Sequence, residues 1–127
     1  MRLCRFEHAG QARCGLYAEQ GVTPLDDLAS IAGEKLLADI LHDGLLERLF
    51  PIGGPAWSVA LRLATDSVLD EARRQLLLQH SDVVPLPPIA APPKLLLLAG
   101  NYSKHVAEQG GTAAERETTF PYVFMKP

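Results

Sequence analysis

The sequence predicts an α+β fold: a small N-terminal domain with antiparallel strands and two helices, followed by the start of a second, mainly β domain. Short runs of mixed polarity, separated by turn residues, occupy the first 25 positions and are typical of strands. Apolar residues then recur at intervals of three and four up to residue 77, as in amphipathic helices. A proline-rich stretch at 85–93 precedes an unbroken apolar run at 95–99, which indicates a new unit beginning with a buried strand.

The composition excludes several protein classes. The chain has 127 residues, 47% hydrophobic and 21% charged, which suits about one ordinary folded domain and excludes disorder. A formal charge of −3 gives no basic field for nucleic acid. No apolar run approaches the ~20 residues that span a bilayer, and the first fifteen residues are too charged for a signal peptide. We therefore expect a cytoplasmic protein without nucleic-acid or membrane partners.

The first elements are predicted to be strands. Met1–Phe6 and Arg13–Glu19 are separated by a turn around Gly10, which predicts a hairpin. Val22–Leu25 follows as a third strand. Its Pro24 lacks an N–H to donate, so this strand is expected at an edge or to end there.

Two cysteines, Cys4 and Cys14, would lie roughly opposite each other in this hairpin. We interpret both as reduced, small apolar side chains that fill a core, because two cysteines make no disulfide framework. A metal site formed by Cys4, His8 and Cys14 is the weaker alternative, since neither cysteine belongs to a C-x-x-C pair.

From residue 26 the period changes to that of a helix, interrupted near Gly33 and ended by Gly44. The apolar positions of this first helix are Leu28, Ile31, Leu36, Leu37, Ile40 and Leu41. Residues 53–55, Gly-Gly-Pro, predict a loop. A second helix would begin at Asp66 or Ser67 as its N-cap. Its predicted buried stripe consists of Val68, Leu69, Ala72, Leu76 and Leu77.

Three segments follow from this pattern. Residues 1–84 form the N-terminal domain, 85–93 a stiff connector, and 94–127 the beginning of a second domain. The connector holds five of the ten prolines, and each fixes its own φ and keeps its predecessor out of the helical region.

The last segment is predicted to contain a strand at 94–99, a short helix at 103–109 ended by Gly110-Gly111, and a strand at 120–126. Because the chain stops directly after an apolar strand, we expect an N-terminal fragment. In it, both strands would lack partners and expose apolar side chains and edges.

A candidate site lies after the first of these strands. His105 and Glu108 are three residues apart and share one face of the predicted helix. A carboxylate beside an imidazole orients the ring and makes it a better proton acceptor, which suits removal of a proton from water. The position after the carboxyl end of a buried strand is common for ligand sites.

The motifs around this pair resemble the fumarylacetoacetate hydrolase family. They are Pro92-Pro-Lys-Leu-Leu-Leu-Leu-Ala-Gly, then Asn101-Tyr-x-x-His105-x-x-Glu108, then Pro121-Tyr-Val-Phe-Met-Lys-Pro127. The start, Met-Arg-Leu-Cys-Arg-Phe with Arg-Cys-Gly-Leu-Tyr at 13–17, also resembles the β-rich leader domain of bacterial members. The match covers residues 85–127, and the resemblance of the leader segments is weaker. It implies that the strand and helix after the connector open a mainly β catalytic domain of that family.

The resemblance implies roles for individual residues. His105 and Glu108 would be a catalytic dyad on a lid, activating water for C–C bond cleavage in 2-oxo or 1,3-diketo acids of the acylpyruvate type. Asn101 and Tyr102 would line the substrate entrance. Lys126 would contact substrate or pack at a strand end. The family's cofactor would be Mg²⁺ or Mn²⁺ stabilising an enolate, and its usual assembly a homodimer.

The chain departs from the family pattern in its metal ligands. The family's Glu-x-Glu pair and later Asp lie downstream of the Lys-Pro motif, so they are expected after Pro127. Glu115-Arg-Glu117 precedes that motif, and we interpret it as a solvated loop. The 127 residues alone are therefore expected to be inactive. A decarboxylase, isomerase or hydratase on the same scaffold stays open, as does a non-catalytic binding or dimerisation module.

Overall fold

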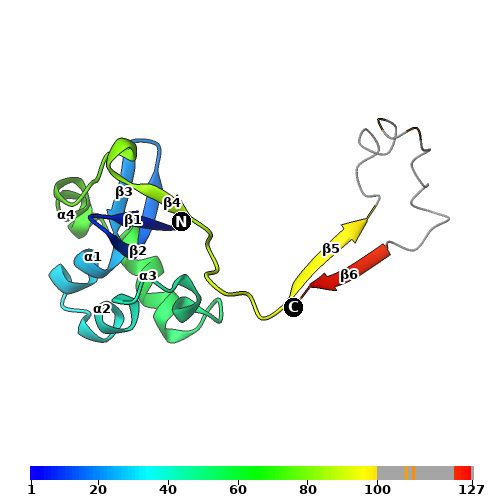
Figure 1. The fold of residues 1–127 in the computed structure, drawn as a ribbon. Helices are drawn as coiled ribbons and strands as arrows, with labels where there is room; N and C mark the ends of the chain where they lie inside the picture. Colours follow the sequence, from blue (N-terminus) through cyan, green and yellow to red (C-terminus); the bar gives the residue numbers. More distant parts are fainter. Residues whose placement is uncertain (100–107, 109, 111–121, 127) are drawn as a thin grey trace. The chain divides into compact units, whose positions relative to one another are not determined.

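A computed structural model of the chain describes residues 1–99, 108, 110 and 122–126. The chain divides into two compact units, Met1–Ala90 and Ala91–Pro127, each described by itself below (Figure 1). Among the described residues, no helix combines the length and apolar character required to cross a membrane.

The first unit contains a four-stranded antiparallel sheet in the order β3-β2-β1-β4. Its strands are β1 (Leu3–His8), β2 (Gln11–Ala18), β3 (Gly21–Pro24) and β4 (Val84–Leu86). The predicted hairpin is confirmed. His8 pairs with Gln11, and the two turn residues Ala9 and Gly10 both have positive φ, 50° and 78°, as a tight hairpin turn requires. β3 is an edge strand and ends at Pro24, also as predicted.

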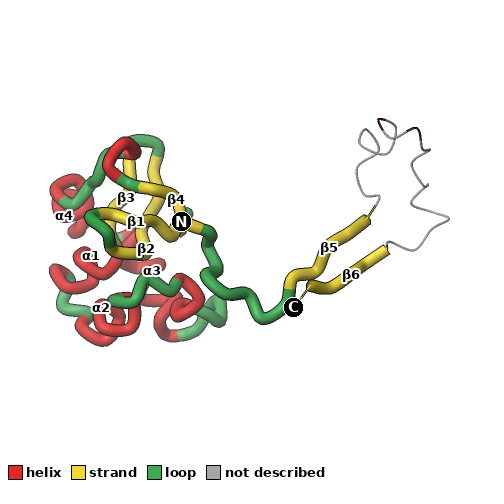
Figure 2. The backbone as a smooth tube through the Cα atoms, in the orientation of Figure 1, coloured by secondary structure: helices red, strands yellow, loops and turns green. Residues whose placement is uncertain are grey.

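β4 was not expected from the sequence. Pro85 and Leu86, which the sequence pattern assigned to the connector, lie in a strand that pairs with Phe6 and Arg5 of β1. A proline is tolerated here because β4 is the edge strand of the sheet. Figure 2 shows that the irregular stretch of chain begins only after β4.

The expectation of two helices is wrong. The described chain has four α-helices: α1 (Leu25–Ile31), α2 (Lys35–Leu41), α3 (Pro55–Thr65) and α4 (Asp70–Gln75). It also has three 3₁₀ helices, Leu46–Leu49, Ser67–Leu69 and His80–Asp82. The predicted first helix is divided at Gly33 into α1 and α2. α3 was not predicted, because Gly53-Gly54-Pro55 at its start is typical of a loop. Pro55 occupies the first turn of the helix, where its missing N–H breaks no helical hydrogen bond.

The second predicted helix is only partly confirmed. The Asp66 side chain accepts a 3.0 Å hydrogen bond from the Val68 N–H and so caps the first 3₁₀ turn before α4. Val68, predicted to be buried, is 85% exposed because this turn is not part of the same regular helix as α4. Leu69, Ala72 and Leu76 of the predicted stripe do pack, half-buried, against the main core.

The main core lies between one face of the sheet and α1, α2 and α3, which Figure 1 shows gathered on that side. Its fully buried side chains include Cys14, Leu28, Leu41 and Leu63. An ion pair fixes the sheet to the helices at the edge of this core. Arg13 of β2 contacts Asp26 and Asp27 of α1, at N–O distances of 2.7 and 2.8 Å.

A smaller core covers the opposite face of the sheet. It consists of buried Phe6, Val22 and Val83 with half-buried Cys4 and Leu78. Val22 and Leu78 exchange two backbone hydrogen bonds of 2.9 Å. This close approach depends on Gly21, because a Cβ at that position would lie 2.1 Å from the Leu78 carbonyl oxygen.

The two cysteines are therefore on different faces, which corrects the prediction that they lie opposite each other. Cys4 pairs with Gly15, and Cys14 pairs with Arg5, one position away. Because successive strand residues alternate between faces, Cys14 enters the main core and Cys4 the smaller one. Burial raises the pKa of Cys4 to about 11 and that of Cys14 to about 12, as expected for small core side chains.

Candidate functional site

The second unit brings the two motif-bearing segments together as a hairpin. β5 (Leu95–Ala99) and β6 (Tyr122–Lys126) are antiparallel, with Ala99 opposite Tyr122 and Leu95 opposite Lys126. Both predicted strands are thus present. The segment with the predicted dyad leaves β5 and returns to β6 at the Ala99–Tyr122 end of this ladder.

The predicted dyad falls largely outside the described residues. His105 lies outside them, as do the predicted substrate residues Asn101 and Tyr102. Glu108 is described, is helical and is exposed to solvent. Gly110 has a φ of 76°, the left-handed conformation expected of a glycine that ends a helix. Two points of the predicted helix at 103–109 and its end are therefore described, and the His105–Glu108 contact stays a prediction.

Lys126 lies at the far end of the same hairpin. It is opposite Leu95, four ladder positions from the Ala99–Tyr122 pair, and it is exposed. At roughly 3.3 Å per strand residue, its backbone is about 13 Å from the end where the dyad segment begins. The strand pairing therefore does not bring Lys126 next to the start of that segment.

The described residues offer no site for a metal ion. Among them, no three His, Cys, Asp or Glu side chains gather closely enough to hold one. The alternative site at Cys4, His8 and Cys14 does not form, because the cysteines lie on different faces of the sheet. His8 contacts the Asp82 carbonyl oxygen instead, at 3.0 Å from Nδ1. Glu115 and Glu117 lie outside the described residues.

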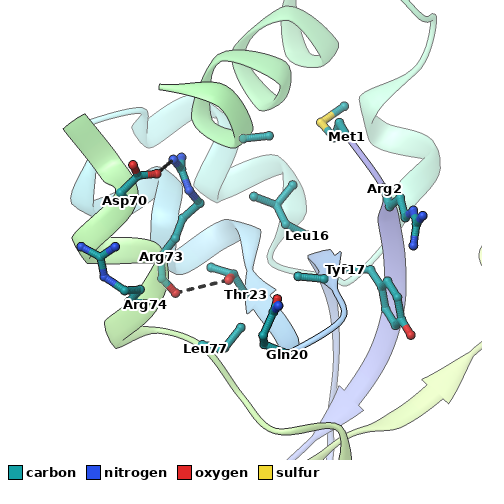
Figure 3. A pocket seen from close by; sticks show the side chains of 12 residues that line it. Met1, Arg2, Leu16, Tyr17, Gln20, Thr23, Asp70, Arg73, Arg74 and Leu77 are labelled. Carbon is teal, nitrogen blue, oxygen red and sulfur yellow. Dashed lines mark hydrogen bonds and ion pairs between the residues drawn. The ribbon is translucent and has the colours of Figure 1, made fainter. Parts of the chain in front are cut away.

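The first unit contains a hollow that the sequence pattern did not indicate. It has a volume of about 430 Å³ and is open to solvent. Its walls come from β2, β3 and α4, and its apolar floor includes Leu16, Ala64 and Leu77. Figure 3 shows Leu16 and Thr23 between Arg74 on one side and Arg2 on the other. No local motif marks this hollow, because its residues come together only through the packing of α4 beside the sheet.

Three arginines and one carboxylate set the charge of this hollow. Arg73 is mostly buried and is fixed by hydrogen bonds to the Leu63 and Asp66 carbonyl oxygens and by an ion pair with Asp70. Arg74 pairs with exposed Glu71, at 2.8 Å. Arg2 makes no side-chain hydrogen bond or ion pair within the described part of the chain.

Thr23 adds a buried hydroxyl to the wall of the hollow. It is 5% exposed and donates only a long, 3.4 Å hydrogen bond to the Arg73 carbonyl oxygen. A hydroxyl also accepts two hydrogen bonds, so Thr23 retains capacity for a ligand. The arrangement can therefore bind a small polar or anionic group, but it contains no nucleophile–base pair.

No protein-family model, curated protein or solved structure matches this chain. The resemblance to the fumarylacetoacetate hydrolase family therefore rests on the sequence motifs at 85–127 and, more weakly, on the leader segments at 1–6 and 13–17.

Proposed function

We propose that residues 94–127 provide the opening strand and the catalytic lid of a metal-dependent hydrolase of the fumarylacetoacetate hydrolase type. Its substrates would be 2-oxo or 1,3-diketo acids such as acylpyruvates, and the reaction cleavage of a C–C bond. The observation that supports the proposal most is the pairing of β5 with β6. This pairing places the strand that precedes the Asn-Tyr-x-x-His-x-x-Glu segment beside the strand that ends at Lys126, so the two motif-bearing strands form one hairpin.

In this proposal His105 accepts a proton from water, and Glu108, three residues later, orients the imidazole and stabilises its charged form. Asn101 and Tyr102 offer hydrogen bonds to substrate oxygens where the segment begins. Lys126 would contact the substrate or pack at the strand end, and it lies at the other end of the hairpin from that point.

Mg²⁺ or Mn²⁺ would supply charge for an enolate, but the described residues do not fit such an ion. In the family pattern the acidic ligands follow the Lys-Pro motif, so the proposal assigns them to residues after that motif and assigns the proton transfer to His105 and Glu108. A decarboxylase, isomerase or hydratase of the same family would use the same proton transfer. Homodimer formation and a cytoplasmic location are parts of the proposal as well.

A non-catalytic binding module is the second candidate. The observation in its favour is that Met1–Ala90 contains its own sheet, two cores and an open hollow. In that case the second unit would serve association rather than catalysis.

The decisive experiment uses the whole uninterrupted reading frame that contains codons 1–127. We expect it to encode Glu-x-Glu after the Lys-Pro motif, and its product to consume an acylpyruvate when Mg²⁺ or Mn²⁺ is present. His105→Ala and Glu108→Gln should each lower kcat by about 10²-fold or more, because general base catalysis contributes about that much. Metal affinity, measured by calorimetry, should stay unchanged.

Lys104→Ala is the matched control, since it alters the same segment without touching the dyad, and it should retain activity. A frame that ends at Pro127 or lacks the acidic ligands would reject the hydrolase proposal in favour of the binding module. Loss of metal affinity in either dyad variant would show that the roles are misassigned.

A further inference from the structure

We infer that the hollow between β2, β3 and α4 binds a small organic acid, with a carboxylate at the arginines and a short apolar chain on the floor. This inference concerns the first unit only and does not depend on the proposed hydrolase activity. The volume of about 430 Å³ is in the range of small-molecule sites and too small for a macromolecular segment of any length.

The charge of the hollow favours an anion. Arg2, Arg73 and Arg74 line the hollow with three positive charges and Asp70 with one negative charge, while Glu71, which is not in the lining, pairs with Arg74. The whole chain has a formal charge of −3, so this wall is positive on a protein that is negative overall. A carboxylate that enters the hollow therefore meets attraction that most of the surface does not offer.

One of the three arginines is already held in place. The guanidinium of Arg73 is mostly buried, and two of its contacts are to backbone carbonyl oxygens, those of Leu63 and Asp66. A guanidinium has five N–H donors, so these bonds and the Asp70 pair leave donors available. Because the side chain is fixed before any ligand arrives, little conformational entropy is lost when it binds one.

The other two arginines can adapt to a ligand. Arg2 is exposed and has no side-chain partner within the described residues. The Arg74–Glu71 pair is exposed on both sides, and such pairs contribute about 0–1 kcal/mol, so a ligand carboxylate can compete with Glu71 for Arg74. The Thr23 hydroxyl offers a further hydrogen bond beside them.

The apolar floor of the hollow favours a ligand that carries a short apolar chain beside its carboxylate. Leu16 is nearly buried, and Ala64 and Leu77 are half-buried, so an apolar chain of a few carbons would cover surface that water now contacts. Inorganic phosphate has the charge but no apolar part, and a neutral amide has the apolar part but no charge. Both should bind more weakly than a short fatty acid.

The test is a titration of the full chain followed by the backbone amide resonances in NMR. Hexanoate is the probe, hexanamide its neutral isostere, and inorganic phosphate the anion without an apolar chain. We expect saturable shifts at Tyr17, Gln20 and Thr23 with hexanoate, and affinities at least about tenfold weaker for the other two probes. The double variant Arg2→Gln/Arg74→Gln should weaken hexanoate binding about tenfold or more, since it removes two charge-assisted contacts.

Arg48→Gln is the matched control, because Arg48 is likewise exposed and paired with one carboxylate, Asp43, outside the hollow. It should bind hexanoate as the parent chain does. Absence of saturable shifts with all three probes would overturn the inference, as would equal binding of hexanoate and hexanamide. Phosphate binding as tight as hexanoate binding would overturn the organic-acid assignment. None of these variants touches His105 or Glu108, so failure here leaves the hydrolase proposal standing.

Discussion

The two units differ in how far their apolar side chains are buried. In the first unit, β2 buries Cys14 and Leu16 on one face against helices of the same unit. In the second unit, the β5–β6 hairpin has apolar residues on both faces, and Leu96 and Met125 are 66% and 59% exposed. A hairpin of two strands is marginally stable in water by itself. The first unit therefore buries the apolar face of its sheet with its own helices. The hairpin, in contrast, has the composition of strands whose faces are buried by other polypeptide.

The largest expected effect distinguishes a buried leucine of the first unit from an exposed leucine of the hairpin. Leu28→Ala should lower the free energy of unfolding by about 2–5 kcal/mol, because Leu28 is fully buried among the helices and its loss leaves a cavity. Leu96→Ala should leave the main unfolding transition unchanged, since Leu96 is exposed. Urea unfolding followed by circular dichroism measures both. Equal losses would mean that the hairpin is part of the same cooperative core.

Within the first unit, two glycines with similar φ distinguish a crowded position from an open one. Gly44 and Gly53 have φ of 67° and 82°. A Cβ at 44 would lie 2.3 Å from the Ala12 carbonyl oxygen, whereas a Cβ at 53 meets nothing within 4 Å. Gly53→Ala should cost about 1 kcal/mol of stability through left-handed strain alone. Gly44→Ala should lower the free energy of unfolding several times more. Thermal denaturation of both variants measures the difference, and similar losses would contradict the close contact at Gly44.

The core thiols predict a loss of stability at high pH. Burial raises the pKa of Cys14 to about 12, while the unfolded thiol ionises near 9.0. The native protein therefore holds its proton where the unfolded chain releases one, so this stabilisation is complete below pH 9.0 and is lost as the pH rises towards about 12. The slope should reach about 1.4 kcal/mol per pH unit for one thiol.

Cys14→Ala should lack this component of the pH dependence, although it is less stable than the parent chain at neutral pH, where the thiol is protonated in both states. Urea midpoints measured from pH 8 to 11 would test this expectation. Parallel curves for variant and parent would mean that the thiol ionises equally in both states.

The smallest effect concerns the exposed faces of the hairpin. Leu96→Ser with Met125→Ser should reduce binding of a hydrophobic dye, because both side chains lie on one exposed face. The stability of the first unit should change by no more than about 0.5 kcal/mol, as is usual for surface substitutions. Val68→Ser, at an exposed position in the first unit, is the control for a single apolar side chain. Unchanged dye binding in the double variant would show that the hairpin is not the main apolar surface.

Strong local signals were sufficient to predict much of the fold. The Gly10 turn, the end of β3 at Pro24, the interruption at Gly33 and the Asp66 cap each depend on a few neighbouring residues. β4 could not be predicted, because its pairing with β1 joins residues about eighty positions apart and its Pro85 is typical of a connector. α3 was missed since Gly53-Gly54-Pro55 indicates a loop as strongly as a helix start.

The two candidate sites differ in the same way. Sequence spacing predicts a site at His105 and Glu108, because two residues three apart on a helix form a pattern that is visible locally. The hollow was invisible, because Arg2, Thr23 and Arg74 come from distant parts of the chain and meet only after α4 packs near the sheet. No charge count along the sequence separates these arginines from the others.

β4 gives the first unit an order of assembly during synthesis. The edge of β1 stays without a partner until residues 84–86 have emerged from the ribosome, so the nascent chain must keep that edge from pairing elsewhere for most of the unit's synthesis. A recombinant version cut after residue 83 would reproduce this unfinished state permanently, whereas one that ends at Ala90 would not.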